Sequence, residues 1–261
     1  MGMGRAFAAL LLAAGWGLVT PGWAETGELH IEANGEDFIR EGFVSKDGWA
    51  LTFAHVKLHF AEVRAFQTDP PFDPDQPGSP SIREEVRLTS LPEVVDLQSP
   101  EPVLIGRVSG APAGFYNALG WQLLPSPALG GASILLEGTA VKGTVKLPFR
   151  LGVDRGYGVI CGEYIGEERR GILQPGGMTV LEATFHFDHL FGDGAQDPGD
   201  PLNQGALGFA PLAALAQQGR VDLTYSQLQS RLSPGDREKL TQALLGLSHT
   251  GEGHCRVEAL S

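Results

Sequence analysis

The segment WALTFAHVKLHFAEVRAF, residues 49–66, indicates the fold more clearly than any other stretch of the chain. It is rich in β-branched and aromatic residues, which favour strands. Because side chains alternate between the two faces of a strand, we predict one mainly apolar face and one polar face. The first face carries Thr52, Ala54, Val56, Leu58 and Phe60, and the second carries His55, Lys57 and His59.

Shorter segments of the same kind lie on both sides of this strand. A hairpin is predicted over residues 132–151, with its turn at Lys142 and Gly143. Residues 68–80 are too rich in proline for a strand or helix and should form an exposed loop. Further strands are predicted at residues 28–33, 86–96, 102–108, 157–164 and 179–189. Many short strands separated by turns are typical of a β-sandwich, here immunoglobulin-like or transthyretin-like, in a mainly β chain.

Helical signals follow residue 205. Thr224 and Gln227 have the spacing of a capping box. Ser233 before Pro234 is typical of a helix start, and Gly246 would end that helix. We therefore predict a sandwich domain over residues 25–205 and a short helical C-terminal region, 206–261, packed on the same domain.

The first 24 residues resemble a secretory signal peptide. Arg5 precedes an apolar run over residues 6–19, and the small residues Gly22 and Ala24 stand at the −3 and −1 positions of a cleavage point before Glu25. The alternative is an uncleaved anchor, but the run is shorter than the roughly 20 apolar residues that a span needs. We expect a periplasmic or secreted protein with no membrane span after cleavage.

The net negative charge of the chain indicates which classes of partner it disfavours. The chain has 19 Lys and Arg against 31 Asp and Glu, and its net charge is −12. Such a surface repels nucleic acid and anionic lipid and attracts cations, although acidity also serves solubility. We therefore expect no nucleic-acid partner.

The only two cysteines, Cys161 and Cys255, are expected to form a disulfide bond, as is usual for an even number of cysteines in an exported protein. The alternative is a pair of thiolate metal ligands. The bond would place residues 249–254 beside residues 156–162, which brings two histidines of the C-terminal segment close to a strand.

Two segments concentrate metal-ligating side chains: EATFHFDHLFGD, residues 182–193, and HTGEGHC, residues 249–255. In an extended strand His186 and Asp188 share one face about 7 Å apart, whereas His189 lies on the other face. His186 and His189 could share an ion only if the strand bends or ends near Asp188. The alternative is an ordinary half-exposed strand and a flexible tail. With the disulfide, we predict a metal site at His186, His189 and His254, completed by His249 or Asp188.

Imidazole and carboxylate ligands suit Cu(II) or Zn(II), with nickel also possible. Methionine is too scarce for a Cu(I) site, since Met178 alone follows residue 24. His55 and His59 would lie roughly 13 Å apart on a strand and cannot share an ion. The acidic loop over residues 193–203 lacks the spacing of an EF-hand, and whether it binds calcium is left open.

We predict an exported, non-enzymatic protein that binds copper or zinc for scavenging, storage or delivery to a membrane metal transporter or a metal-accepting protein. The sequence has no nucleophile elbow, no His-Glu-x-x-His motif and no phosphate-binding loop. The alternatives are a β-sandwich binding or adhesion module without a metal, and a metallohydrolase with an open coordination position.

Three segments resemble the periplasmic copper-binding MbnP-like family: residues 49–66, GFYNALGW at 114–121, and the C-terminal segment at 249–255. The resemblance implies an exported all-β protein whose copper site has two imidazoles and an oxidised tryptophan. Trp49 and Trp121 are the only tryptophans after residue 24, so either one would be the candidate.

Overall fold

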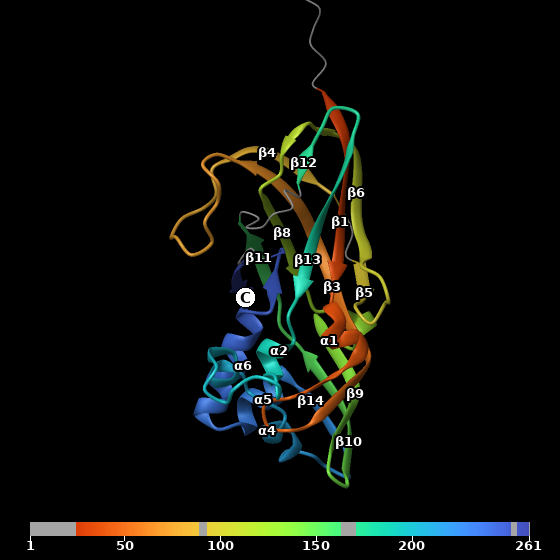
Figure 1. Cartoon of the computed structure of the whole chain (residues 1–261), viewed down its shortest axis with the longest axis vertical. Coiled ribbons are helices and arrows are strands. Elements are labelled where there is room, and N and C mark those ends of the chain that lie inside the picture. The colour runs from red at the N-terminus through yellow and green to blue at the C-terminus, as the bar shows by residue number, and fades with distance from the viewer. Residues whose placement is uncertain (1–24, 89–92, 163–170, 252–254, 261) are drawn as a thin grey trace, which may run out of the picture.

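The computed structural model describes residues 25–88, 93–162, 171–251 and 255–260, and these residues form a mainly β structure, as predicted. The signal peptide predicted over residues 1–24 lies outside the described residues. Two sheets pack face to face over one hydrophobic core, so the prediction of a sandwich is confirmed. Figure 1 shows the sheets running along the long axis, with most of the helices gathered at one end.

The larger sheet is built around the long strand predicted at residues 49–66. Its order is β14 (Val221–Thr224), β10 (Val145–Val153), β9 (Ile134–Lys142), β3 (Ala50–Thr68), β8 (Ala118–Leu123), β11 (Tyr157–Cys161) and β16 (Cys255–Ala259). The short strands β2 (Phe43–Val44), β4 (Ile82–Arg87) and β5 (Glu93–Asp96) also pair with β3. The predicted hairpin is confirmed as β9 and β10, whereas the strand predicted over residues 86–96 is two strands, β4 and β5.

Two bulges change which residues of β3 face the core. The pairing register shifts between Phe53 and His55 and again between Ala61 and Arg64. Phe53 and Val56 are therefore both buried, although strict alternation would place residues three positions apart on opposite faces of the strand. Thr52 and Ala54 are exposed. The predicted apolar face was wrong for Thr52 and Ala54, because a bulge inserts one residue and reverses the alternation beyond it.

The smaller sheet has the order β15 (Ser248–His249), β13 (Met178–Phe185), β1 (Thr26–Asn34) and β6 (Val103–Pro112). Its strands β1 and β13 run parallel. The ring of Phe185 lies 5.8 Å from that of Phe60 and 6.0 Å from that of Trp121, which come from the larger sheet. These aromatic contacts join the inner faces of the two sheets. A separate two-stranded sheet joins β7 (Gly114–Phe115) to β12 (Ile172–Leu173).

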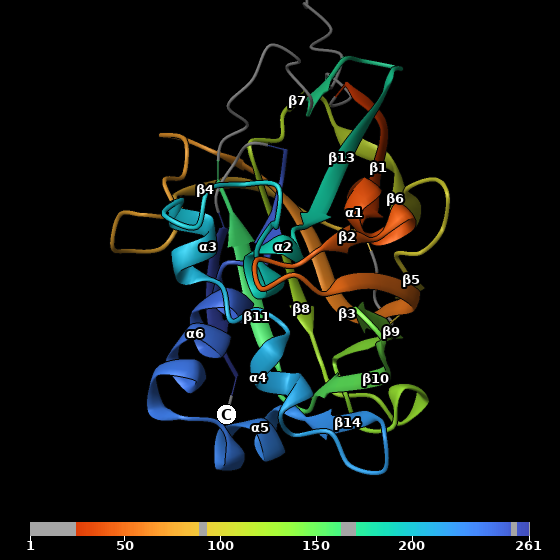
Figure 2. The ribbon, with the colours of Figure 1, turned by 60° about the horizontal axis from the view of Figure 1, so that its bottom comes forward.

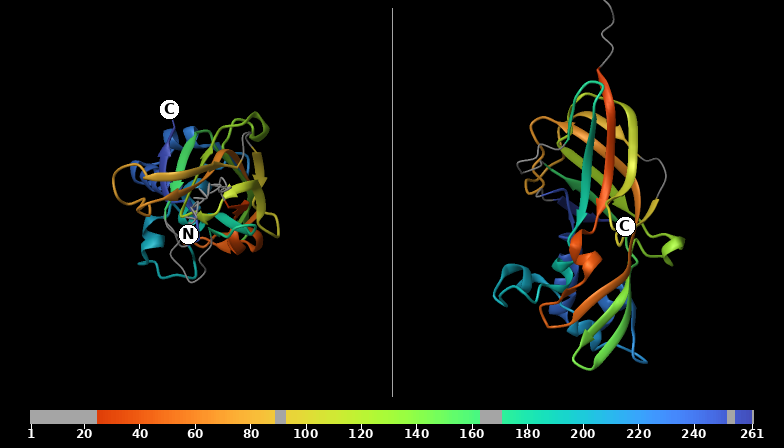
Figure 3. Two further views of the ribbon diagram at one scale, coloured as in Figure 1. Left: turned by 90° about the horizontal axis from the view of Figure 1, so that it is seen from above. Right: turned by 45° about the vertical axis from the view of Figure 1, so that its right-hand side comes forward.

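The helices are short. They are α1 (Glu36–Glu41), α2 (Asp188–Phe191), α3 (Pro201–Gly205), α4 (Ala210–Ala213), α5 (Tyr225–Arg231), α6 (Pro234–Leu245) and the single 3-10 turn η1 (Pro127–Leu129). Figures 2 and 3 show α4, α5 and α6 gathered around the end of the larger sheet that carries β10 and β14. Among the described residues, none of these helices has both the length and the apolar character that a membrane crossing requires.

The predicted helix ends are confirmed. Thr224 and Gln227 form a complete capping box at the start of α5. The Ser233 hydroxyl accepts the backbone N–H of Asp236 at the start of α6, and Gly246 caps its other end. The segment after residue 205 is more than helical, because β14, β15 and β16 return from it to both sheets.

The predicted disulfide bond is also confirmed. Cys161 and Cys255 lie opposite each other on β11 and β16 and are bonded. Both cysteines are thereby excluded as thiolate metal ligands in this oxidised form. The bond ties the end of the chain to the middle of the larger sheet, 94 residues earlier.

Candidate metal centre

The site begins where strand β13 ends. The predicted strand over residues 179–189 was too long, because pairing stops at Phe185 and helix α2 begins at Asp188. At this junction the His186 N–H donates to the Leu247 carbonyl, and the His189 N–H donates to the His186 carbonyl. The chain therefore turns at the point where the sequence required a bend for His186 and His189 to share an ion.

The turn brings three side chains of this segment together. One ligand atom from each of His186, Asp188 and His189 lies within 4.8 Å of the other two. In a tetrahedral site with bonds of about 2 Å, ligand atoms lie about 3.3 Å apart. All three side chains are partly buried. Small side-chain rotations are therefore enough to close the group around one ion.

His249 joins this group from a distant part of the chain. Strand β15 pairs with β13, and His249 lies opposite Thr184. The His249 ring centre is 4.4 Å from that of His186 and 5.3 Å from that of His189, and the latter two are 5.6 Å apart. Three imidazoles thus form a compact triangle, which we call the histidine cluster (His186, His189 and His249).

His254 cannot be placed in the same way. Residues 252–254 lie outside the described residues, so the ligand role predicted for His254 stays a prediction. The adjacent Cys255 is described, and its bond to Cys161 fixes where this segment meets the larger sheet.

One carbonyl group orients two of the imidazoles. The Gly246 oxygen, at the end of α6, lies 2.7 Å from His189 Nδ1 and 3.2 Å from His249 Nε2. Because a carbonyl can only accept, each of these nitrogens carries the proton. The lone pairs of the neutral rings are then on His189 Nε2 and His249 Nδ1, and a metal would be bound through these nitrogens.

Carboxylates surround the histidine cluster. Glu36 Oε2, at the start of α1, lies 3.5 Å from His186 Nδ1. Burial raises the pKa of Glu36, and the negative charges of Asp188 and Glu182 raise it further. Glu36 also has a positive φ of 60°, a conformation that costs a non-glycine residue of order 1–3 kcal/mol. Grouped half-buried carboxylates are costly on their own and attract a cation.

Glu36 was not among the residues predicted for the site. Glu36 is far from residue 186 in the sequence and carries no motif of its own. The parallel pairing of β1 with β13, which matches Asn34 with Thr184, brings α1 beside the end of β13. Glu36 could be predicted as a site residue only from the pairing of β1 with β13, and local sequence patterns do not reveal strand pairing.

The two histidines of β3, His55 and His59, have hydrogen-bond partners within the fold. His55 Nδ1 lies 2.6 Å from Asp96 Oδ2, and His59 Nδ1 lies 2.6 Å from the Leu124 carbonyl oxygen. Among the described residues, neither belongs to a group of three or more potential ligands. That His55 and His59 do not share an ion stays a prediction.

The acidic loop over residues 193–203 has a structural account. Side-chain oxygens of Asp193, Asp197 and Asp200 accept the backbone N–H groups of Ala195, Gly199 and Leu202. The Asn203 amide donates to the carbonyls of Asp193, Gln196 and Asp197. The acidic side chains thus shape the turns of the loop.

The two candidate tryptophans lie in the aromatic core. Trp121 is 2 % exposed and packs on Phe185, the residue before His186. Trp49 is 7 % exposed and packs on Phe209, at a ring distance of 5.3 Å. Trp121 is thus linked to the histidine cluster through one intervening residue of β13.

No protein-family model, no curated protein and no solved structure matches this chain. A fold of this class hosts many unrelated functions, so the function of this chain has to follow from the geometry of the site.

Proposed function

We propose that this protein binds one transition-metal ion, Cu(II) or Zn(II), through His186, His189 and His249, with Asp188 as a further ligand and His254 available from the adjoining segment. The observation that carries the proposal is the convergence of His249, from β15, on the pair at the end of β13. Imidazole rings from two distant segments meet beside a carboxylate, and this donor set suits Cu(II) and Zn(II).

The surroundings of the histidine cluster support a cation rather than a purely structural arrangement. The Gly246 carbonyl orients two of the rings, in the manner of the outer-shell partners of metal-binding histidines. Glu36 and Glu182 add negative charge next to Asp188. A bound divalent cation would offset the mutual repulsion of these carboxylates.

We propose binding and transfer of the ion rather than catalysis. Three imidazoles and Asp188 can fill a four-coordinate shell, whereas a catalytic zinc keeps one position for water or substrate. The proposed role is scavenging, storage or delivery of the ion to a membrane metal transporter or a metal-accepting protein. The resemblance of three sequence segments to copper-binding MbnP-like proteins supports copper as the ion.

The proposed location is periplasmic or secreted. The disulfide bond is of the kind that persists in oxidising compartments. The sequence pattern of the first 24 residues supports export through a cleaved signal peptide.

Metal content and affinity of the purified protein test the proposal. We expect one Cu or Zn per chain, and we expect His186→Ala and His249→Ala each to abolish stoichiometric binding. His55→Ala is the matched control, because His55 is a partly exposed histidine held by Asp96 on the larger sheet. The effect of His254→Ala reports whether the undescribed segment contributes a ligand.

The proposal is wrong if His186→Ala and His249→Ala leave Cu and Zn stoichiometry and affinity unchanged. It is equally wrong if the wild-type protein shows no thermal shift with Cu, Zn, Ni or a chelator, which is the behaviour of an adhesion module without a metal. Zinc-dependent turnover of ester, phosphoester or peptide substrates would instead assign a metallohydrolase.

A further inference from the structure

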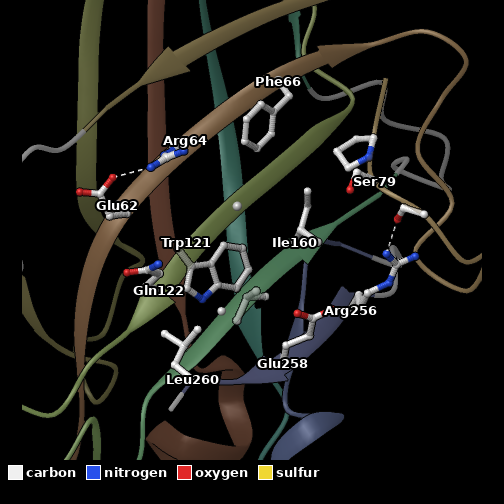
Figure 4. Close-up of a pocket in the computed structure, with 15 residues that line it drawn as sticks. Glu62, Arg64, Phe66, Ser79, Trp121, Gln122, Ile160, Arg256, Glu258 and Leu260 are labelled. Carbon is white, nitrogen blue, oxygen red and sulfur yellow. Dashed lines mark hydrogen bonds and ion pairs between the residues drawn. The ribbon is translucent and has the colours of Figure 1, made fainter. Parts of the chain in front are cut away.

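A groove of about 330 Å³ crosses the outer face of the larger sheet. It runs over β8 and β11, between residues 62–66 of β3 on one side and β16 with the loop at residues 78–80 on the other (Figure 4). Its volume is within the range of small-ligand sites. None of its lining residues belongs to the histidine cluster, so the groove and the candidate metal centre are separate sites.

The floor of the groove is made by glycine. On β8 the core-facing side chains are Leu119, Trp121 and Leu123, so Gly120 and Gln122 face outward by alternation. Gly158 of β11 lies opposite Gln122, and Ile160 lies opposite Gly120. Gly120 is buried beneath the edge of the Phe66 ring. The sheet backbone is therefore uncovered at Gly158, which is partly exposed beside Gln122 and Ile160.

Packing alone does not require glycine at position 158. A Cβ atom at Gly158 would approach only Leu260 Cδ2, at an ordinary contact distance of 3.5 Å. A β-branched residue would favour the strand more strongly than glycine does. The glycine keeps the groove open at a position where a larger side chain would fit the sheet.

One wall of the groove is held rigidly. The Arg256 guanidinium donates to the carbonyl oxygens of Pro74, Gln76 and Gly78, and it lies over the Phe72 ring at 5.1 Å. This fixes the loop that forms the wall before any ligand arrives, which lowers the entropic cost of binding. It also uses most of the hydrogen-bond donors of Arg256.

The arginine of the opposite wall, Arg64, also pairs with groups of the protein itself. Arg64 is paired with Glu62 at 2.6 Å and with Glu85 at 3.3 Å, and Arg87 adds a second cation to Glu62. Arg64 and Arg256, the two arginines that line the groove, are therefore both paired with groups of the protein itself. The Glu258 carboxylate, in contrast, is exposed and has no hydrogen bond or ion pair to another side chain or backbone group in the described part of the chain.

The groups left for a ligand are thus mainly acceptors. They are the Glu258 carboxylate and the Gln122 amide, beside the apolar side chains of Ile160 and Leu260. In a chain with a net charge of −12, the complementary ligand has an apolar body and a cationic donor. We propose that the groove binds a primary aliphatic ammonium group, with its hydrocarbon chain over Gly158 and Ile160 and its N–H donors at Glu258.

Two sources supply this chemistry: a free amine or diamine, and a lysine side chain of an extended peptide. Titration calorimetry of the full mature protein with hexylamine, cadaverine and an acetylated, amidated lysine tripeptide distinguishes them. Tighter binding of the amines assigns a small-molecule ligand, and tighter binding of the tripeptide assigns a protein partner. Hexanol, which has the same chain without the charge, should bind about tenfold more weakly than hexylamine.

Two variants locate the binding. Gly158→Val should abolish it by filling the floor, and Glu258→Gln should weaken it about tenfold, as expected for loss of a charge-assisted hydrogen bond. Glu101→Gln, at another exposed glutamate, is the matched control and should bind as the wild type does. Thermal unfolding checks that the Gly158→Val variant folds. If that variant does not fold, Glu258→Gln still tests the proposal.

The proposal is overturned if no amine or lysine peptide binds saturably to the wild type. Binding that is unchanged in Glu258→Gln, or binding of hexanol as strong as that of hexylamine, also overturns it.

Discussion

Removal of the disulfide bond has a consequence that can be calculated from the structure. Replacing both Cys161 and Cys255 with alanine should lower the free energy of unfolding by about 4.7 kcal/mol at 25 °C. The bond closes a loop of 94 residues, and the chain-entropy relation assigns about this value to a loop of such length. The five paired positions of β11 and β16 remain, so the variant should still fold into the same sheet.

The same double variant should weaken metal binding. His249 lies between the end of α6 and Cys255, so the bond anchors the chain on the far side of His249. Without the anchor, strand β15 loses part of its ordering, and bringing His249 to the ion then costs conformational entropy.

Urea denaturation and metal titration measure these two effects separately. Wild-type protein reduced with dithiothreitol is the matched control for the urea denaturation, because it should lose the same stability without any substitution. The metal titration compares the wild type with the double variant in the absence of dithiothreitol, since a dithiol binds Zn(II) and reduces Cu(II). A loss of stability below about 1 kcal/mol would refute the entropic account. An unchanged metal affinity would show that β15 is held by its pairing with β13 alone.

Three further predictions concern charges. Glu36→Gln should weaken metal binding about 10–100-fold in a titration, because the Glu36 carboxylate contacts the metal-binding ring of His186. The same variant should raise the thermal stability of the metal-free protein, because it removes repulsion with Asp188 and Glu182. Asp37→Asn, at the exposed neighbouring residue, is the control and should change neither quantity. Metal affinity, followed by titration from pH 8 to 5, should fall below about pH 6.5, because protonated imidazole cannot bind a metal; a flat profile would exclude imidazole ligands. Burial raises the pKa of Asp154, but hydrogen bonds from Ser226 and Thr224 outweigh burial and lower it overall. Asp154 therefore stabilises the fold above its unfolded pKa of about 3.9, and the stability gap between wild type and Asp154→Ala in urea should close as the pH falls below that value; a gap that persists at pH 2 would contradict this.

The local parts of this fold are readable from the sequence. The hairpin of β9 and β10 is recognisable because alternation and the turn at Lys142 and Gly143 involve only near neighbours. The capping box at Thr224 and the start of α6 at Ser233 are recognisable for the same reason. Helix α1 has no comparable signal, since its N-cap residue is Gly35, which has no side chain with which to cap the helix.

The bulges of β3 show where local reading fails. Strict alternation placed Ala54 with Val56, but pairing with β9 inserts an extra residue between Phe53 and His55. The insertion satisfies the packing of two sheets and has no mark in the sequence of β3 itself. A prediction from periodicity therefore fails beyond each bulge.

The candidate site also has features that local sequence determines and features that long-range pairing determines. The sequence by itself determined the chemistry: which histidines and carboxylates stand in clusters, that Cys161 and Cys255 form a bond, and that His186 and His189 need a bend between them. Tertiary structure decided the geometry, because β13 stops at Phe185 and β15 pairs beside it, which places His249 on the other two rings. The approach of Glu36 to His186 was decided in the same way, since it depends on the pairing of β1 with β13. Ligand type follows from residue identity, but convergence depends on long-range strand pairing, which periodicity within a short segment does not encode.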